Sequence, residues 1–158
     1  MTRHVLFVCT GNTCRSAMAE ALLRRALPAG SAWRVASAGV AAMANAPASE
    51  YAAEVLAELG IDLAAHRSQP VTRKRAAEAA VIIAMTRQHV ARLCEMFPDT
   101  CGRIYLMRSF DPSVHPETDV GDPFCGSLAD YRNCRGILQR SIPGILHCLE
   151  TVEAADAL

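Results

Sequence analysis

Short apolar runs alternate with stretches of helical spacing along most of the chain. Four runs have the length and composition of buried strands: "HVLFV" (4–8), "WRVAS" (33–37), "AVIIAM" (80–85) and "RIYLM" (103–107). Three segments between them have the spacing and caps of helices: 16–27 behind Ser16, 49–59, and a segment from Thr86 to before Pro98. Strands alternating with helices are joined by right-handed crossovers, so the order predicts an α/β three-layer sandwich with a four-stranded parallel sheet.

The remaining third of the chain begins with a stretch that has no period. Residues 108–126, "RSFDPSVHPETDVGDPFCG", contain three prolines, two glycines and four acids, which predicts a long and functional loop. Residues 127–152 then have helical character, and Pro143 with Gly144 should kink or split that helix. At 158 residues the chain is too short for two ordinary domains, so we expect one domain over 1–158.

Composition excludes several partners. The 16 basic and 16 acidic side chains cancel, which argues against nucleic acid or an anionic membrane as the main partner, and no apolar run approaches the ~18 residues of a membrane span. An odd count of seven cysteines without a secretory signal indicates a reducing, cytoplasmic location. The histidine spacing suggests no metal site, no cofactor is implied, and nothing demands more than a monomer.

The turn after the first predicted strand has the composition of a reaction site. Residues 9–16, "CTGNTCRS", lie between a strand and a helix, where ligands bind in open parallel sheets. The backbone N–H groups there should form an anion cradle at the helix N-terminus, with Gly11 allowing close approach and Asn12 shaping the turn. These groups and the Arg15 guanidinium favour the thiolate of Cys9, and Arg15 can grip two phosphate oxygens. A cysteine, five residues, an arginine and a serine therefore predict nucleophilic chemistry on a phosphate.

The stretch "VCTGNTCRSAMAEALL", together with "DPF" at 122–124, resembles the low-molecular-weight protein tyrosine phosphatases over essentially the whole chain. The resemblance implies a phosphotyrosine protein phosphatase I-like fold, a phosphocysteine intermediate, no metal, phosphorylated proteins as substrates and inorganic phosphate as product. It also implies the following roles: nucleophile Cys9; phosphate binding by Thr10, Gly11, Asn12, Thr13, Cys14, Arg15 and Ser16; general acid Asp122; and loop support by Asn12, Ser16, Ser37 and His66.

A general acid on the long loop is also expected on chemical grounds. The leaving group must take a proton as the thiolate attacks, and a carboxylic acid over the site can supply it. Asp111, which is also followed by proline, and Asp119 are the rivals of Asp122. The surroundings "GDPFCGS" match the family pattern, which favours Asp122.

The phosphorylated side chain stays open between two candidates. Tyrosine-specific members carry aromatic walls, whereas this chain has Phe124 followed by Cys125, and Met43 where a large aromatic is expected. Thr13 replaces the usual larger aliphatic residue, and with "MTRQH" after the third strand it resembles the bacterial protein arginine phosphatases of the family. Phosphoarginine and phosphotyrosine are both retained, with Thr13, Met43 and Phe124 as the expected specificity residues.

Other readings of the motif remain. Thioredoxin-coupled arsenate reductases share the loop but need a cysteine directly after the third strand, where this chain has Thr86; Cys94 and Cys101 alone have a suitable separation. A non-catalytic phosphoprotein-binding module would be expected to lack the nucleophile, arginine or acid. Finally, Cys14 lies five residues from Cys9, so a reversible disulfide that inactivates the enzyme is expected, as the resemblance also suggests.

Overall fold

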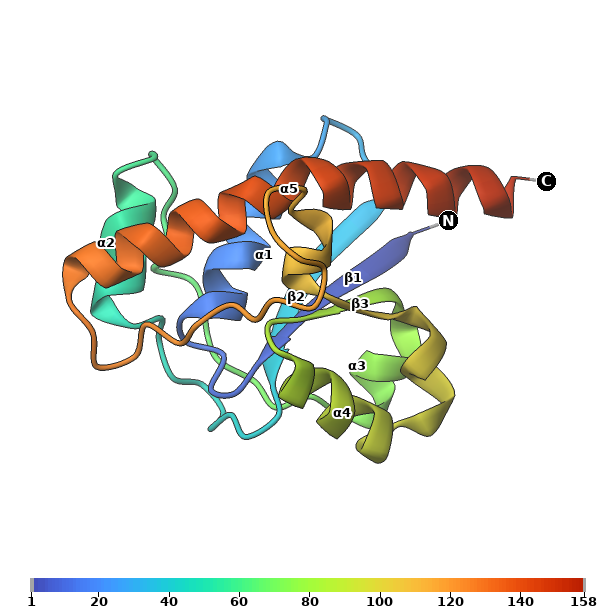
Figure 1. Cartoon of the computed structure of the whole chain (residues 1–158), viewed down its shortest axis with the longest axis horizontal. Coiled ribbons are helices and arrows are strands. Elements are labelled where there is room, and N and C mark those ends of the chain that lie inside the picture. Colours follow the sequence, from blue (N-terminus) through green and yellow to red (C-terminus); the bar gives the residue numbers. More distant parts are fainter. Residues whose placement is uncertain (1, 158) are drawn as a thin grey trace.

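A parallel sheet covered by helices on both faces makes up the molecule, in a computed structural model that describes residues 2–157 (Figure 1). Its elements in chain order are β1 (Arg3–Cys9), α1 (Arg15–Ala26), β2 (Trp33–Gly39), α2 (Glu50–Ala57), α3 (Arg73–Glu78), β3 (Ala79–Ala84), α4 (Arg87–Met96), the 3₁₀ turn η1 (Pro98–Arg103), β4 (Ile104–Leu106), the 3₁₀ turn η2 (Met107–Phe110) and α5 (Leu128–Asp156). The α/β sandwich with a four-stranded parallel sheet is thereby confirmed.

The strand order places the end of β1 at the topological switch point of the sheet, where successive connections lead to opposite sides. The order is β2-β1-β3-β4, so the connection from β1 leads to one side and the chain then crosses back to β3 on the other side. Cys9 pairs with Gly39 at the last position of the β1–β2 ladder. Ligands bind outside the carboxyl ends of strands at such a switch point, which is where the chain leaves β1.

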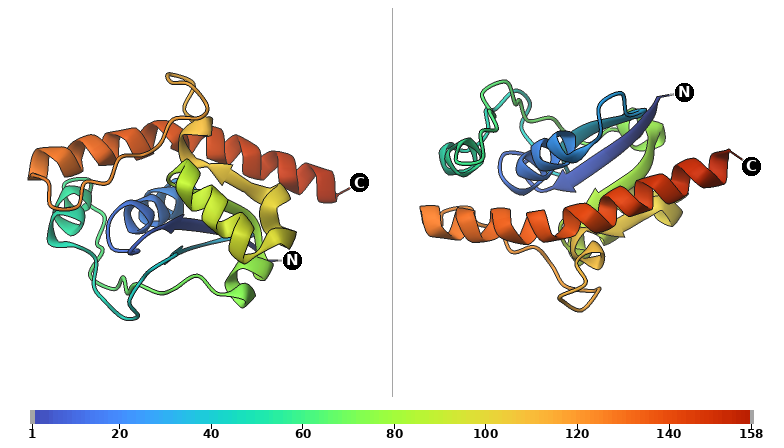
Figure 2. Two further views of the ribbon diagram at one scale, coloured as in Figure 1. Left: turned by 60° about the horizontal axis from the view of Figure 1, so that its bottom comes forward. Right: turned by 90° about the horizontal axis from the view of Figure 1, so that it is seen from above.

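Alternating side chains of the central strands divide the core into two layers. Val5 and Phe7 of β1 face the layer that contains α1, α2 and α5, and Leu6 and Val8 face the layer that contains α3 and α4. Figure 2 shows α5 on one side of the sheet, with α1 and α2 beside it, and α4 on the other side. Central strands buried on both faces need continuous apolar runs, which is why these runs were readable in the sequence.

Three expectations about helices are corrected. The first helix begins at Arg15 with Cys14 as its N-cap, so Ser16 is an interior residue and caps nothing. The segments α3, η1 and η2 were not expected as elements, and the two 3₁₀ turns shorten the fourth strand from the predicted 103–107 to Ile104–Leu106. The last helix is a single helix of 29 residues that runs through Pro143 without splitting.

The pair Pro143–Gly144 has a different use from the one expected. A Cβ atom on Gly144 would lie 2.5 Å from the backbone oxygen of Phe110 in η2. The glycine therefore lets α5 approach η2 closely, at the start of the long loop. Packing of the apolar face of α5 against the core offsets the hydrogen bond that Pro143 cannot donate.

Candidate active site

The Cys9–Ser16 loop surrounds the sulfur of Cys9. Cys9 is 3% exposed, its Sγ lies 2.9 Å from Ser16 Oγ, and the Asn12 amide donates to it at 3.3 Å. The loop is fixed from behind because Val40 N donates to Cys9 O at 2.9 Å. The loop therefore places the Asn12 amide and the Ser16 hydroxyl around the sulfur, at the N-terminus of α1.

Asn12 holds the shape of the loop. It is fully buried with a φ of 58°, the left-handed conformation that asparagine tolerates better than most residues. Its Nδ2 donates to Ser16 Oγ and Ser37 Oγ, both at 2.8 Å. Gly11 is expected to permit a close approach of the backbone to an anion, which stays a prediction; beyond its chain neighbours, the nearest protein atom to a Cβ there would be Thr13 Oγ1 at 3.8 Å. Within the protein, the strained position of the turn is that of Asn12.

His66 and Glu20 lie behind Asn12. His66 Nε2 donates to the Asn12 carbonyl at 2.7 Å, and its Nδ1 lies 3.8 Å from Glu20 Oε2. Ser37 donates its hydroxyl proton to the same carboxylate. The sequence reasoning named Ser37 and His66 and missed Glu20, although Glu20 lies four residues after Ser16 and so on the same face of α1.

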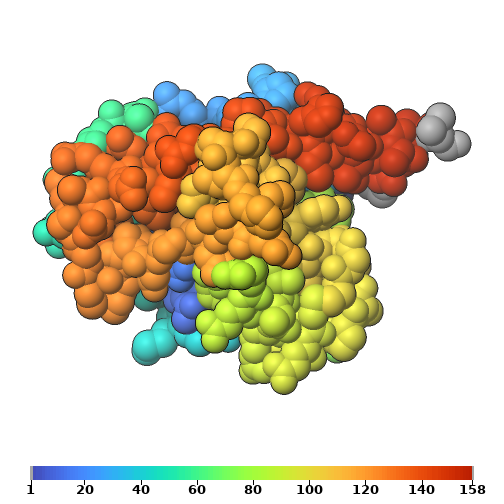
Figure 3. All heavy atoms as spheres, in the orientation of Figure 1, coloured from blue at the N-terminus to red at the C-terminus, as the bar shows by residue number. Residues whose placement is uncertain are grey.

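Arg15 and Asp122 meet over the loop. Arg15 is buried, donates from Nη1 to Val120 O at 2.9 Å, and places Nη2 3.4 Å from Asp122 Oδ2. The side chain of Asp122 is 50% exposed. Figure 3 shows the orange segment before α5 at the front of this face, with a small blue area of the N-terminal part visible between it and the green atoms of α4.

The two rival carboxylates point elsewhere. Asp111 is buried beside Arg108 and Arg140, 3.6 and 3.5 Å away. Burial raises its pKa, but hydrogen bonds from Ser113 and these two guanidinium groups outweigh burial and leave the pKa below its usual value. Asp119 accepts from the Arg87 amide at the start of α4, which lowers its pKa. Each therefore has a structural task, and neither lines the cleft.

The cleft over the loop has a volume of about 200 Å³. It is lined by Cys9, Thr10, Gly11, Asn12, Thr13, Cys14, Arg15, Asp122 and Phe124. Phe124 is 67% exposed at its wall. Met43 is 82% exposed and does not line this cleft, so its part in specificity stays a prediction.

Cys14 faces away from solvent among hydroxyl groups. Its Sγ lies 3.2 Å from Ser49 Oγ and 3.4 Å from the Tyr131 hydroxyl. Burial, together with the contact to Cys14, raises the pKa of Tyr131 to about 12, and burial raises the pKa of the Cys134 thiol to about 12. Both Cys9 and Cys14 are free thiols in the structure, and the sequence reasoning anticipated neither Ser49 nor Tyr131.

A buried histidine of α4 reaches the loop from the other side. His89 Nε2 lies 2.8 Å from Thr10 Oγ1, and its Nδ1 has no partner among the described residues. Burial lowers the pKa of His89 to about 4, and the Arg15 guanidinium adds to that decrease. His89 is therefore neutral at physiological pH. The motif "MTRQH" was noted in the sequence only as part of a resemblance, so this contact was missed.

The remaining candidates lie outside the cleft. Thr86 accepts from the His89 amide and caps α4, as expected, so the arsenate reductase reading lacks its cysteine there. Cys94 and Cys101 are joined in a disulfide between α4 and η1. Across residues 2–157, no three His, Cys, Asp or Glu side chains are placed to hold a metal ion together. In the described part of the chain, no helix combines the length and apolarity that crossing a membrane requires.

The arrangement combines a thiol, a guanidinium group and a carboxyl group at one cleft. Cys9 and Arg15 are buried, the side chain of Asp122 is half exposed, and all three residues line the cleft. Such a set can transfer a phosphoryl group to sulfur and then to water.

Comparison with known proteins agrees with this geometry. Residues 4–155 match the family described as low molecular weight phosphotyrosine protein phosphatase. A protein-arginine-phosphatase of Geobacillus stearothermophilus is 39% identical over 152 residues, 96% of this chain and 99% of the relative. A probable low molecular weight protein-tyrosine-phosphatase, EpsP of Ralstonia solanacearum, is 33% identical over 142 residues, 90% and 92% of the two chains.

A solved structure adds a chemical observation. A mutant YwlE arginine phosphatase, in which serine replaces the active-site cysteine and is phosphorylated, superposes with a TM-score of 0.83 at 35% identity. The match covers 93% of this chain and 95% of that chain.

Proposed function

Because the chain belongs to the low molecular weight phosphotyrosine protein phosphatase family and is a cysteine-dependent protein phosphatase, we propose that Cys9, Arg15 and Asp122 carry out its reaction and that its preferred substrate is phosphoarginine in proteins. The observation that carries the catalytic assignment is the contact of Arg15 with Asp122 over the Cys9 sulfur.

In the first step, the Cys9 sulfur attacks phosphorus and the bond to the leaving nitrogen or oxygen breaks. The Asp122 carboxyl gives its proton to the leaving atom, and a phosphocysteine forms. Arg15 and the loop amides hold the phosphoryl oxygens as their charge redistributes. The loop is kept in this shape by Asn12, with Ser37 and His66 behind it.

In the second step, the Asp122 carboxylate takes a proton from water and the water oxygen attacks phosphorus. The sulfur–phosphorus bond breaks, inorganic phosphate leaves, and Cys9 returns as a thiolate stabilised by the Ser16 hydroxyl. The phosphorylated serine of the YwlE mutant supports a phosphoenzyme at this position.

Thr13 supports phosphoarginine as the substrate. Its side chain lines the cleft, where a hydroxyl suits a planar, polar guanidinium better than an aliphatic residue would. The arginine phosphatase of Geobacillus stearothermophilus is also the more similar of the two relatives described above. Phe124 favours the second candidate, phosphotyrosine, because an exposed aromatic at the wall can stack on a phenyl ring.

The test compares phosphoarginine and phosphotyrosine in one peptide sequence, with wild type and Thr13→Ile. We expect kcat/KM to favour phosphoarginine in wild type and the preference to fall by about 10-fold or more in Thr13→Ile, which is ~1.4 kcal/mol of discrimination. Phe124→Ala is the matched control, since it should weaken phosphotyrosine hydrolysis more than phosphoarginine hydrolysis. A wild-type preference for phosphotyrosine that Thr13→Ile leaves unchanged would contradict the assignment.

We also propose the domain organisation, oligomeric state and location of the enzyme. A single domain over 1–158 that acts as a monomer in the cytoplasm fits the neutral charge balance and the single sheet. The reversible Cys9–Cys14 disulfide also remains a proposal; the presence of two free thiols on the one Cys9–Ser16 loop supports it.

A further inference from the structure

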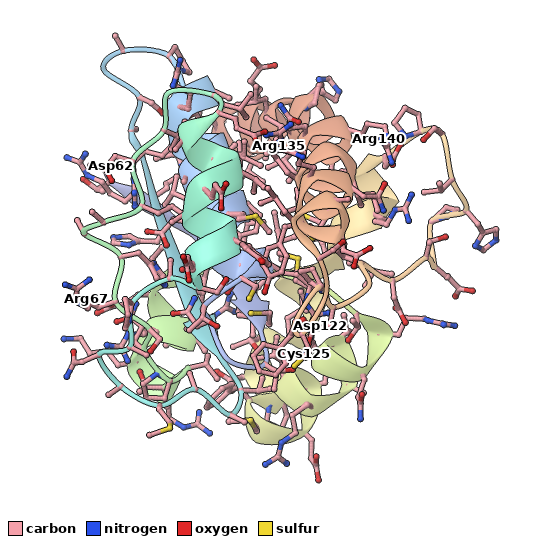
Figure 4. The ribbon with its side chains drawn as sticks, turned by 90° about the vertical axis from the view of Figure 1, so that its left-hand side faces the viewer. Asp62, Arg67, Asp122, Cys125, Arg135 and Arg140 are labelled. Atoms are coloured by element: carbon pink, nitrogen blue, oxygen red, sulfur yellow. A yellow bond between two sulfur atoms is a disulfide. The ribbon has the colours of Figure 1, made fainter. Side chains whose placement is uncertain are left out.

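A second hollow of about 620 Å³ lies on the flank of the molecule, between α1 and residues 60–69. None of its lining residues lines the cleft over Cys9. Figure 4 shows Asp62 and Arg67, which belong to its lining, at one edge of the molecule, well apart from Asp122 and Cys125. Its volume is in the range of small-molecule sites in proteins, about 300–1,000 Å³.

The lining combines apolar walls with a positively charged mouth. Apolar walls come from α1 and from the segment after α2: Ala17, Ala21, Ile61, Leu63 and Ala65. Three arginines, Arg24, Arg25 and Arg67, contribute positive charge against the two carboxylates of Glu20 and Asp62. A hollow with these walls is suited to a compact molecule that carries a negative charge.

Two of the arginines are not neutralised. Arg25 donates only to Leu59 O, at 3.3 Å, and Arg67 donates only to the carbonyls of Ala64 and His66, at 3.0 and 2.7 Å. No carboxylate among residues 2–157 is within ion-pair distance of either guanidinium. Both retain donors for an anionic group, whereas Arg24 already pairs with Glu20.

The inner wall of this hollow is connected to the Cys9–Ser16 loop. Glu20, Ser37 and His66 line it, and Glu20 accepts from Ser37. His66 donates to Asn12 O at 2.7 Å, and Asn12 Nδ2 donates to Ser37 Oγ at 2.8 Å. Asn12 in turn donates to the Ser16 hydroxyl beside the Cys9 sulfur. Two short hydrogen-bond routes therefore run from this wall to the reacting sulfur.

We propose that the flank hollow is a regulatory site for a small organic anion, an acidic group on an apolar or aromatic body, held by Arg25 and Arg67. A bound anion competes with Glu20 for Arg24, and the change at Glu20 passes through Ser37 and His66 to Asn12. Binding at the two sites is then coupled: a ligand in the hollow changes the affinity of the cleft for its ligand, and a ligand in the cleft changes the affinity of the hollow by the same factor. The binding half of this proposal does not depend on which phosphorylated residue is the substrate.

The binding test uses 1-anilinonaphthalene-8-sulfonate, a fluorescent aromatic sulfonate, with the intact protein. We expect one molecule bound per chain, and a loss of affinity of about 10-fold or more in Arg25→Glu and in Arg67→Glu. Arg34→Glu, an exposed position on β2 outside the lining, is the matched control and should bind as wild type does. Equal affinity in all four proteins would overturn the proposal.

The coupling test repeats the titration with increasing orthovanadate, a phosphate analogue for the cleft. We expect the dissociation constant of the dye to change by about 5-fold or more and then to reach a plateau. In Glu20→Gln the dye should still bind while vanadate no longer shifts its affinity. A dissociation constant that rises without limit would mean that the dye occupies the cleft, and one that never changes would mean that the two sites are independent; either result overturns the coupling.

Failure of the catalytic assignment would look different. If wild type did not hydrolyse aryl phosphates, the proposed reaction would be contradicted. The result that dye binding depends on Arg25 and Arg67 would not be affected. Conversely, normal hydrolysis in Arg25→Glu and Arg67→Glu with unchanged dye binding would contradict only the flank site.

Discussion

At the scale of single residues, the Asp122 carboxyl differs from two similar side chains in its surroundings. Three aspartates lie on the long loop. Asp111 forms ion pairs with two arginines, and Asp119 accepts a hydrogen bond from the Arg87 amide. Asp122 lines the cleft. All three aspartates are candidates by sequence, where the surrounding "GDPFCGS" favours Asp122, and in the folded loop Asp122 alone of the three lines the cleft.

Replacement of Asp122 by asparagine should lower kcat/KM most for substrates whose leaving group must be protonated as it departs. We expect kcat/KM to fall by about 10²- to 10⁴-fold for a poor leaving group such as an alkyl-substituted phenyl phosphate, and far less for nitrophenyl phosphate. Asp119→Asn is the control, which should lower activity without changing the dependence on the leaving group. Equal losses for good and poor leaving groups would remove Asp122 as the general acid.

Several residues of the site could be predicted because local sequence places them. Cys9, Arg15 and Ser16 lie at fixed spacings between a strand and a helix, and the structure puts them around one sulfur and one cleft. Contacts such as His89 with Thr10 and Tyr131 with Cys14 join residues 79 and 117 positions apart. No local pattern encodes such pairs, since the tertiary fold alone brings them together.

At the scale of elements, α5 shows how a helix can contain a proline and remain continuous. Sequence reasoning predicted a kink or a break at Pro143, because it weighed the lost hydrogen bond alone. The apolar face of α5 packs on the core over most of its length, and Gly144 approaches Phe110 O closely. Packing therefore outweighs the local preference, as it does for many helices.

Two glycines of α5 should respond in opposite directions to alanine. Gly144→Ala places a methyl group 2.5 Å from a backbone oxygen, so we expect the free energy of unfolding to fall by roughly 1–3 kcal/mol. Gly136→Ala meets only the end of the Arg140 side chain at 3.8 Å, so a gain of about 0.5–1 kcal/mol is expected. Urea unfolding of the two variants checks this, and equal changes in both would contradict the close approach.

The connection between α4 and the Cys9–Ser16 loop should make stability depend on pH. Burial lowers the pKa of His89 from 6.5 to about 4, so below pH 6.5 the unfolded chain binds a proton that the folded chain does not. The contribution of neutral His89 to stability is therefore fully present above pH 6.5 and is lost progressively as the pH falls to about 4. In urea titrations, His89→Gln should show a shallower decline over this range than wild type.

A second histidine provides the comparison. His147 is 84% exposed on α5, so His147→Gln should retain the wild-type decline. Equal slopes for wild type and His89→Gln would show that His89 titrates normally in the folded protein.

At the scale of the whole molecule, the site follows from the strand order. The alternation of apolar runs and helices sufficed to predict a parallel sheet, because each buried central strand needs an unbroken apolar run. The order β2-β1-β3-β4 then places the end of β1 at the switch point, and the long loop before α5 returns to cover it. The flank hollow had no sequence signal, since its lining comes from α1, β2 and the segment after α2.

The most direct test of the account is to trap the phosphoenzyme. Wild type and Asp122→Asn are mixed with excess phosphopeptide, quenched within one turnover in a buffer that preserves phosphocysteine, and digested for mass spectrometry. We expect one phosphoryl group on the peptide that contains Cys9 in wild type and in Asp122→Asn, and none in Cys9→Ala. Turnover of the phosphopeptide by Cys9→Ala, or a phosphoryl group found on another residue of wild type, would contradict the account.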